Sequence, residues 1–550
     1  MKKNSLNTAV LASLAGIAGI ANISSAVNIN SDGTGQVLIY PYYTVNAGNL
    51  TLLSVVNTTN QGKAVKVRFL EGRNSLEVLD FNLYLSREDV WTAAVLASSA
   101  TSAAGILTFD NSCTAPQLYT SRTAPRVAQP FLQTLYQNDL AALRGVERTR
   151  EGHFELIEMG VIKANSDLND DIEHLDDDFP PAGGCQRNFL RATSNTAILA
   201  DMTVPTGGLF GGAAVLNIAN GTYINYSATA LDGFWSPAAN PAGNFHSKPD
   251  DVFPSLTSVG SAITNIAGGT NETPVSLVFS NGQIIRSAWG TGSGTGGING
   301  TPSRVDAVSA LFMNDSLLNE YTTETGNNNA SEWVITFPTK RYYVNNGVTA
   351  GQPNAAFPPF TNPYFGGQAC ESLQFISWNR EELTAINDCT TNPTASGCGF
   401  SPPSPGAPPS ALCFETNVLS FNQNITNEAN GTSSPSKILG SRLTRNINTP
   451  SIGASAANPS TATSAGWLRI GMDIDLAAGN ALRQTRPSVA VPALNIVGGQ
   501  RFVGLPSIGF WAVSIENNNA TPGVKGFYGG AYDHKHGRRC TIAQGSCFTP

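Results

Sequence analysis

The sequence predicts a mainly β protein with antiparallel, sandwich-like sheets, a few packed helices and long disulfide-stapled loops. Three features of the 550 residues lead to this prediction. Several short runs alternate apolar and polar residues with the two-residue period of a half-buried strand. Segments rich in Gly, Ser, Asn and Pro separate these runs. Eight cysteines, an even number, are available to close the loops.

The clearest alternation predicts an antiparallel hairpin over residues 62–85. In VKVRF, residues 65–69, the two valines and the phenylalanine share one face, and the lysine and arginine share the other. LDFNLYL, residues 79–85, alternates in the same way, and EGRNS, residues 71–75, supplies a glycine and an asparagine for the turn. We expect one face of this hairpin to be buried and the charged face to be solvated.

Other segments also have strand character. VLIYPYYTV, residues 37–45, contains Pro41, which lacks the N–H that a central ladder needs, so this strand is expected at an edge or at a bulge. Further strands are expected in LTLLSVVNTT (50–59), SEWVITF (331–337), WLRIGMDIDL (467–476) and IGFWAVSI (508–515).

Two segments, residues 130–146 and 303–321, have apolar residues at helical spacing. The second begins with Ser303 and has Asp306 three positions later, which resembles a capping box. Both helices are expected to pack on the sheets.

The N-terminal residues have the pattern of a secretory signal peptide, residues 1–26. Lys2 and Lys3 precede an apolar run at residues 9–21, and SSA, residues 24–26, offers small residues for cleavage. No later run reaches the roughly 18 apolar residues that span a bilayer, so no transmembrane helix is expected. We therefore expect export.

The rest of the chain divides on composition into three regions. Residues 27–120 are expected to form an N-terminal β domain, and residues 121–290 a mixed α/β region with an acidic loop. Residues 303–550 are expected to form a C-terminal β-rich region with a Cys- and Pro-rich insertion at 370–413.

An exported chain with an even number of cysteines is expected to form disulfides, although the sequence leaves their pairing open. The candidates are Cys113, Cys185, Cys370, Cys389, Cys398, Cys413, Cys540 and Cys547.

Composition excludes some partners. Charged residues make up only 13%, and the net charge of −7 leaves no basic footprint for nucleic acid. Gly, Ser, Thr and Asn take the place of charges, which suits exported proteins that sit in a matrix or lattice.

The acidic stretch at residues 165–179 is the stronger of two candidate metal sites. Asp167, Asn169, Asp171 and Glu173 alternate like the oxygen ligands of a Ca²⁺ loop, but Ile172 occupies the position where an EF-hand needs glycine. A solvated acidic loop is the alternative. No other cofactor is expected.

Other candidate sites carry weaker signals. Asp533, His534 and His536 could bind Zn²⁺ or Cu²⁺, or form a solvated turn. The chain contains neither G-x-S-x-G nor H-E-x-x-H, so no hydrolase motif stands out. Aromatic residues could stack on sugars or belong to the core: Tyr40, Tyr42, Tyr43, Trp235 and Trp289.

Several segments, among them QVLIYPYYTV, VDAVSALFMNDSLLNEY, WVITFPTKRYYV and GLPSIGFWA, resemble a family of exported proteobacterial proteins of unknown function. The resemblance implies export from a Gram-negative cell to the periplasm, cell surface or exterior. It carries no site residues.

These observations favour a non-catalytic, exported structural or interaction protein of the cell surface, such as an envelope-layer (S-layer-like), coat or matrix subunit. It would associate with itself or with envelope components, assisted by Ca²⁺. The alternatives are a glycan- or surface-binding adhesin module and, with less support, a secreted hydrolase.

Overall fold

The computed structural model describes residues 26–118, 125–133, 135, 139, 141–174, 179–192, 198–236, 244–260, 272–291, 301–324, 329–344, 355–380, 382, 384–387, 411–423, 435–449, 463–521, 524–543 and 545–547. Residues 1–25 of the predicted signal peptide lie outside these ranges, as do Cys389 and Cys398.

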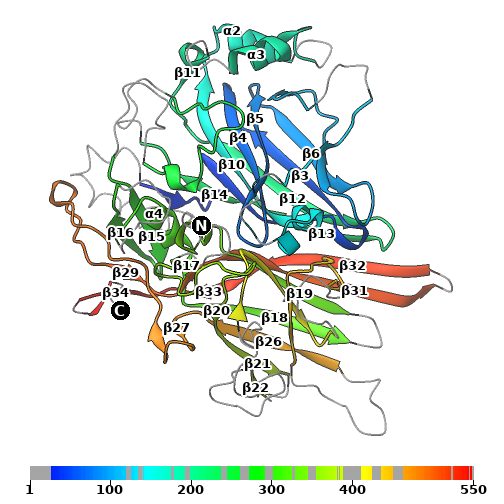
Figure 1. Cartoon of the computed structure of the whole chain (residues 1–550), viewed down its shortest axis with the longest axis vertical. Helices are drawn as coiled ribbons and strands as arrows, with labels where there is room; N and C mark the ends of the chain where they lie inside the picture. The colour runs from blue at the N-terminus through cyan, green and yellow to red at the C-terminus, as the bar shows by residue number, and fades with distance from the viewer. Residues whose placement is uncertain are drawn as a thin grey trace, which may run out of the picture.

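The described chain is mainly β, and two large antiparallel sheets form its N-terminal half (Figure 1). The eight-stranded sheet runs in the order β1 (Asn28–Ile29), β14 (Thr229–Asp232), β2 (Val37–Thr44), β10 (Glu151–Ile162), β4 (Gly62–Glu71), β5 (Glu77–Leu85) and β8 (Cys113–Ala115), with β11 (Met202–Thr203) paired to β10. The six-stranded sheet runs in the order β13 (Thr222–Ser227), β12 (Leu209–Asn217), β3 (Leu50–Asn57), β6 (Val90–Ala97), β7 (Ala104–Leu107) and β9 (Gln129–Pro130).

Two five-stranded sheets form the C-terminal half, drawn in green to red beneath the first two sheets in Figure 1. One contains β22 (Thr384–Asn387), β21 (Gln374–Asn379), β26 (Thr463–Gly471), β18 (Ser316–Glu324) and β33 (Lys535–Gly537). The other contains β25 (Thr444–Ile447), β24 (Thr416–Phe421), β19 (Ala330–Thr336), β31 (Ile508–Thr521) and β32 (Val524–Asp533).

Short pairs and helices complete the described fold. The pairs are β15 (Val275–Ser280) with β16 (Gln283–Ala288), β17 (Met313–Asn314) with β30 (Leu505–Pro506), β20 (Glu371–Ser372) with β23 (Ala411–Leu412), and β27 (Ile474–Asp475) with β28 (Ala481–Leu482). β34 (Cys540–Ile542) lies between β29 (Arg501–Phe502) and β35 (Gly545–Ser546). The α-helices are α2 (Asp167–Ile172), α3 (Gly184–Ala192), α4 (Val305–Phe312) and α5 (Arg341–Val344). None of these helices is long and apolar enough to cross a membrane.

The two N-terminal sheets pack face to face as a sandwich. Apolar side chains from both inner faces form one buried cluster, in which the rings of Tyr40 and Phe154 stack at 4.2 Å. The cluster continues into the C-terminal half, where Tyr226 stacks on Phe510 of β31 at 4.7 Å. The predicted antiparallel, sandwich-like fold is therefore confirmed in its class.

The predicted domain boundary near residue 120 needs correction. Both N-terminal sheets combine strands from before residue 120 with strands between residues 151 and 232. Composition changes at this point, but the strand ladders pair across it, so residues 27–120 and 121–290 do not form separate units. The five-stranded sheets, by contrast, use only strands that follow residue 303.

The predicted hairpin exists as β4 and β5, but its charged face is not solvated. Lys66 and Arg68 are buried, and Lys66 pairs with Asp80 on β5. Lys66 Nζ also donates to the backbone oxygen of Lys248 at 3.2 Å, because residues 244–260 cover this face of the sheet. The predicted strands and turn are therefore confirmed. The prediction that the charged face is solvated is wrong, because residues 244–260 cover that face.

Pro41 lies at a bulge, which is one of the two predicted arrangements. The pairing of β2 with β10 shifts between Tyr40 and Tyr43, so the proline needs no ladder partner. On its other side β2 pairs with β14 only as far as Ile39. The missing N–H of the proline is therefore tolerated inside the sheet.

The two predicted helices are only partly realised. Residues 305–312 form α4, and Ser303 N donates to Asp306 Oδ2 at 2.7 Å, which is one half of the predicted capping box. The N-cap residue is Arg304, and its side chain makes no capping hydrogen bond. From residue 316 the chain is a strand instead, because pairing with β26 buries Leu317 and Tyr321. The described part of residues 130–146 begins with the last residue of β9 and contains a 3₁₀ turn at Ala141–Leu143, and no α-helix.

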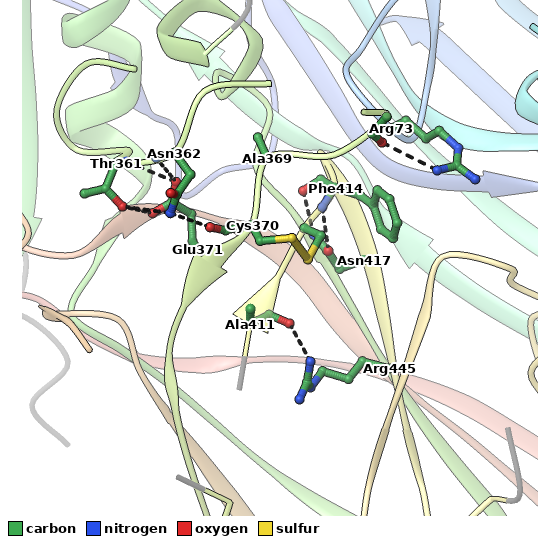
Figure 2. The surroundings of a disulfide bond; sticks show 12 residues. Arg73, Thr361, Asn362, Ala369, Cys370, Glu371, Ala411, Phe414, Asn417 and Arg445 are labelled. Carbon is green, nitrogen blue, oxygen red and sulfur yellow. Dashed lines mark hydrogen bonds between the residues drawn. A yellow bond between two sulfur atoms is a disulfide. The ribbon is translucent and has the colours of Figure 1, made fainter. Parts of the chain in front are cut away.

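Three disulfides close loops in the described chain: Cys113–Cys185, Cys370–Cys413 and Cys540–Cys547. The second joins the ends of β20 and β23, and Figure 2 shows its surroundings. Arg73, at the tip of the β4–β5 turn, lies over the Phe414 ring at 5.2 Å, so this disulfide lies where the two halves meet.

Candidate functional site

The outer face of the six-stranded sheet is open, whereas the described eight-stranded sheet is buried on both faces. Along β3, Leu53 and Val55 point into the sandwich core, while Leu52 is 40% exposed on the opposite face. The same alternation along β6, β12 and β13 leaves apolar and small polar side chains exposed. This face is the only large sheet surface of the N-terminal half that the described residues leave uncovered.

A hollow of about 710 Å³ lies on this face and is called here the trough. Its floor consists of residues that the strand register places side by side across the sheet. One such row runs from Ser227 through Gly212 and Ser54 to Thr92. The parallel row from Ala214 through Leu52 reaches Ala94. The trough is lined by Leu52, Leu53, Ser54, Thr92, Ala93, Ala94, Leu107, Phe109, Phe210, Gly211, Gly212, Ala213, Ala214, Tyr223, Asn225, Tyr226 and Ser227.

Small residues on β12 create the hollow. Gly212 and Ala214 occupy outward positions at which larger side chains would fill the space. Gly211 points inward, where an added Cβ would come within 2.1 Å of the Tyr40 hydroxyl. The run Gly-Gly-Ala-Ala therefore allows close packing on the inner face of the sheet and leaves space on its outer face.

Aromatic side chains border this floor. Phe109 is 74% exposed, Tyr223 is 52% exposed and Phe210 is 42% exposed. Exposed aromatic side chains gathered around one hollow are a feature of binding sites rather than of ordinary surface.

No charged side chain lines the trough. The polar side-chain groups of its lining residues are the hydroxyls of Ser54, Thr92, Ser227 and the two tyrosines, together with the amide of Asn225. Such a surface suits a neutral ligand that presents both C–H faces and hydroxyls, because rings can pack on the former while the small polar groups bond the latter.

The four predicted calcium ligands lie on a helix and not in a loop. Ser166 caps α2, which carries Asp167, Asn169 and Asp171, and Glu173 follows at its end. The spacing separates these residues into two pairs, 167 with 171 and 169 with 173, and Asn169 Nδ2 donates to Glu173 Oε2 at 3.2 Å, so the four side chains do not form one ligand set.

These side chains also have other partners. Arg187 pairs with Asp171 at 2.6 Å, and Arg87 pairs with Glu173 at 2.8 Å. Across the described part of the chain, no group of three or more His, Cys, Asp and Glu could hold a metal ion. The calcium prediction has no geometric support and is not carried further.

The candidate histidines at the C-terminus separate in the structure. His534 is buried against Trp333, with Nε2 at 3.0 Å from the Val334 oxygen, whereas His536 is exposed on β33. The expected exposed turn is therefore wrong for His534, because β33 pairs with β18 and draws the tail into the fold.

The aromatic residues singled out as sugar-stacking candidates are core residues. Tyr40, Tyr42, Tyr43, Trp235 and Trp289 are all at most 1% exposed. The exposed aromatic residues around the trough were not recognised in the sequence. One feature of the sequence could have indicated them. The Gly-Gly-Ala-Ala run lies in a strand-like segment, and glycine in a strand often indicates a place where another molecule or backbone approaches closely.

Four buried groups with shifted pKa values are closed to substrate. Burial lowers the pKa of His153 and of His246 to about 3, and raises the pKa of Glu415 to about 8. Burial also lowers the pKa of Lys340 to about 8. All four side chains are buried, and none of them lines the trough.

Comparison with known proteins adds no assignment: no family model matches the chain, and neither the curated proteins nor the solved structures include a match.

Proposed function

We propose that the protein is an exported, non-catalytic interaction protein of the Gram-negative cell surface, and that it binds a neutral glycan in the trough. The observation that carries this proposal is the uncharged hollow of about 710 Å³ with exposed aromatic residues at its border. Sugar rings have apolar faces that pack on aromatic side chains and hydroxyls that bond to serine, threonine and asparagine.

Binding is favoured over catalysis by the chemistry of the lining. Hydrolysis needs a nucleophile or a metal-bound water together with an acid or base within hydrogen-bond reach. The side chains that line the trough supply hydroxyls and an amide, and none of them is a histidine, a carboxylate or a lysine. Asp110 lies next to this lining, where its Oδ2 accepts from the Thr92 N–H at 3.2 Å.

A glycan is favoured over a second copy of the chain by the polar row on the floor. Ser54, Thr92 and Ser227 would lose their water on contact with another protein surface. Each hydroxyl left without a partner would cost roughly 1–3 kcal/mol. An envelope-layer subunit that assembles through this face is therefore the second outcome to test.

The test is a glycan array probed with the purified, labelled protein. A double variant, Phe210→Ala/Tyr223→Ala, removes two of the bordering rings. The matched control, Phe279→Ala/Tyr528→Ala, removes two exposed rings of the same types that lie outside the trough. We expect the wild type and the control to bind the same glycans, and the trough variant to lose that binding.

Two results would overturn the proposal. One is an array on which the wild type binds no glycan, and the other is glycan binding that the trough variant retains. Sedimentation of the same samples distinguishes the layer hypothesis, which requires self-association that the trough variant abolishes.

A further inference from the structure

A second hollow lies on the same face, where β3 begins and β6 ends. Its volume is about 560 Å³, and it lies between the turn at residues 45–50, the end of β6 with residues 97–100, and Pro435. Arg150 and Arg442 both line it, and no acidic side chain does. We call it the arginine pocket.

Arg150 is held by neutral acceptors. Its Nε donates to Asn46 Oδ1 at 2.9 Å, and its Nη2 donates to the Val45 oxygen at 2.9 Å. Its Nη1 donates to the backbone oxygens of Ser99 at 3.1 Å and Ser102 at 2.6 Å. These contacts fix the guanidinium in place without neutralising its charge.

Arg442 adds a second positive charge. Its backbone N–H donates to Glu151 Oε1 at 2.8 Å, but its guanidinium has no hydrogen-bond or ion-pair partner in the described part of the chain. Burial, and after it the charge of Arg442, lowers the pKa of Arg150. Glu151 offsets part of this charge, but its other oxygen accepts from Tyr42, and it does not line the pocket.

The turn that borders the pocket has two further features. Asn46 is 3% exposed, and its Nδ2 is a buried donor without an acceptor among the described residues. Ala47, which also lines the pocket, has a φ of +53°, and Asn217 Nδ2 holds its oxygen at 3.0 Å. An unpaired buried donor beside a strained backbone is typical of a site that a ligand completes.

The arginine pocket continues the trough. Leu50 of the pocket and Leu52 of the trough lie on the same face of β3, and Leu96 and Ala94 have the same relation on β6. Residues two apart in a strand are about 7 Å apart, so the two hollows are neighbours within the span of one or two sugar rings.

We propose that the arginine pocket binds the carboxylate of an acidic sugar whose neighbouring rings lie in the trough. The ligand would then be a uronic-acid-containing polysaccharide whose neutral rings occupy the trough as in the proposed function, on which this inference rests. The planar guanidinium of Arg442 matches a carboxylate with two parallel hydrogen bonds. Arg150 and Asn46 position the pocket and add positive charge.

The experiment compares matched ligands. Oligosaccharides that contain one galacturonate, glucuronate or mannuronate among neutral sugars are each titrated beside their carboxyl-reduced, neutral counterparts. We expect at least one uronate to bind the wild type about tenfold more tightly than its neutral counterpart. One charge-assisted hydrogen bond accounts for a difference of about this size.

Variants then locate the effect. Arg442→Gln should reduce the uronate affinity to that of the neutral oligomer and leave the neutral affinity unchanged, while Arg442→Lys retains part of the preference. Arg380→Gln, which removes an exposed charge far along the chain and outside both hollows, should change neither affinity.

The outcomes separate this inference from the proposed function. Equal affinity for the uronate and its reduced form, or a uronate preference that Arg442→Gln retains, overturns the arginine pocket alone. Neutral binding that is lost in Phe210→Ala/Tyr223→Ala still supports the trough in that case. Failure of the wild type to bind any oligomer or array glycan overturns both.

Discussion

Lys63 Nζ lies 2.7 Å from Glu158 Oε1, and neither side chain is exposed. The ammonium also donates to Thr206 Oγ1 at 2.7 Å and to the Gly207 oxygen at 2.8 Å. Lys63 pairs with Leu85 and Glu158 pairs with Val65, so this ion pair lies on the sandwich-core face of the eight-stranded sheet. On the opposite face, Lys66 and Arg68 of β4 pair with carboxylates of β5 and β10. The sheet is therefore buried on both faces, although one face is ionic.

Removing one partner of this pair should cost far more than removing both charges. Lys63→Met leaves Glu158 buried and unpaired, so we expect a loss of about 3–5 kcal/mol in the free energy of unfolding. In Lys63→Met/Glu158→Gln the single amide oxygen can still accept from one of the two backbone N–H groups, of Thr206 and Gly207, that the carboxylate binds. Urea unfolding should show that the double variant regains part of the loss. A double variant no more stable than Lys63→Met would contradict the ion-pair explanation.

Mild acid should destabilise the fold through its buried histidines. Burial lowers the pKa of His153 and of His246 to about 3, and that of His534 to about 4. The unfolded chain binds these protons near pH 6.5 and the folded chain does not, so their contribution to stability is complete above pH 6.5 and declines below it. Each ring contributes up to about 1.4 kcal/mol per pH unit in that range.

His246→Gln tests this pH dependence. The amide can still accept from the Tyr84 hydroxyl, which lies 2.9 Å from His246 Nε2. The difference in unfolding free energy between wild type and variant should be constant above pH 7 and should shift in favour of the variant between pH 6.5 and 5. Parallel stability profiles over that range would show that His246 titrates normally in the fold.

The disulfides should differ in their contribution to stability. Cys370–Cys413 joins residues 43 apart, whereas Cys540–Cys547 joins residues 7 apart. Because a longer loop loses more entropy on closure, Cys370→Ser/Cys413→Ser should cost roughly 1.5 kcal/mol more than Cys540→Ser/Cys547→Ser. Denaturant unfolding of both variants measures this difference. A larger loss on removing the terminal bridge would show that loop entropy does not set the order.

The local pattern predicted strands well and their surroundings poorly. The alternation in β4 and β5 was sufficient to place the hairpin and its turn, because a period of two is a property of each segment alone. Whether Lys66 faces water depends on residues 244–260, which lie more than 170 positions away. The sequence of the hairpin contains no information about that cover.

The candidate site was missed for a related reason. Tyr40 and Trp235 look as suitable for sugar stacking as Phe210 and Tyr223, and only the sheet order determines which of them are exposed. The trough needs β3, β6, β12 and β13 to lie side by side, and these strands come from segments as far apart as residues 50–57 and 222–227. For the acidic stretch, the alternating oxygen-bearing residues predicted a calcium-binding loop, but Ser166 caps a helix there.

Ligand binding in the trough is tested most directly by calorimetric titration of the best array glycan into wild type and Ala94→Leu. Ala94 lies on the trough floor, so the added isopropyl group fills the hollow and removes no contact. We predict that the glycan affinity falls at least about tenfold while the free energy of unfolding stays within about 0.5 kcal/mol of wild type. Equal glycan affinities for the two proteins would contradict binding at this face.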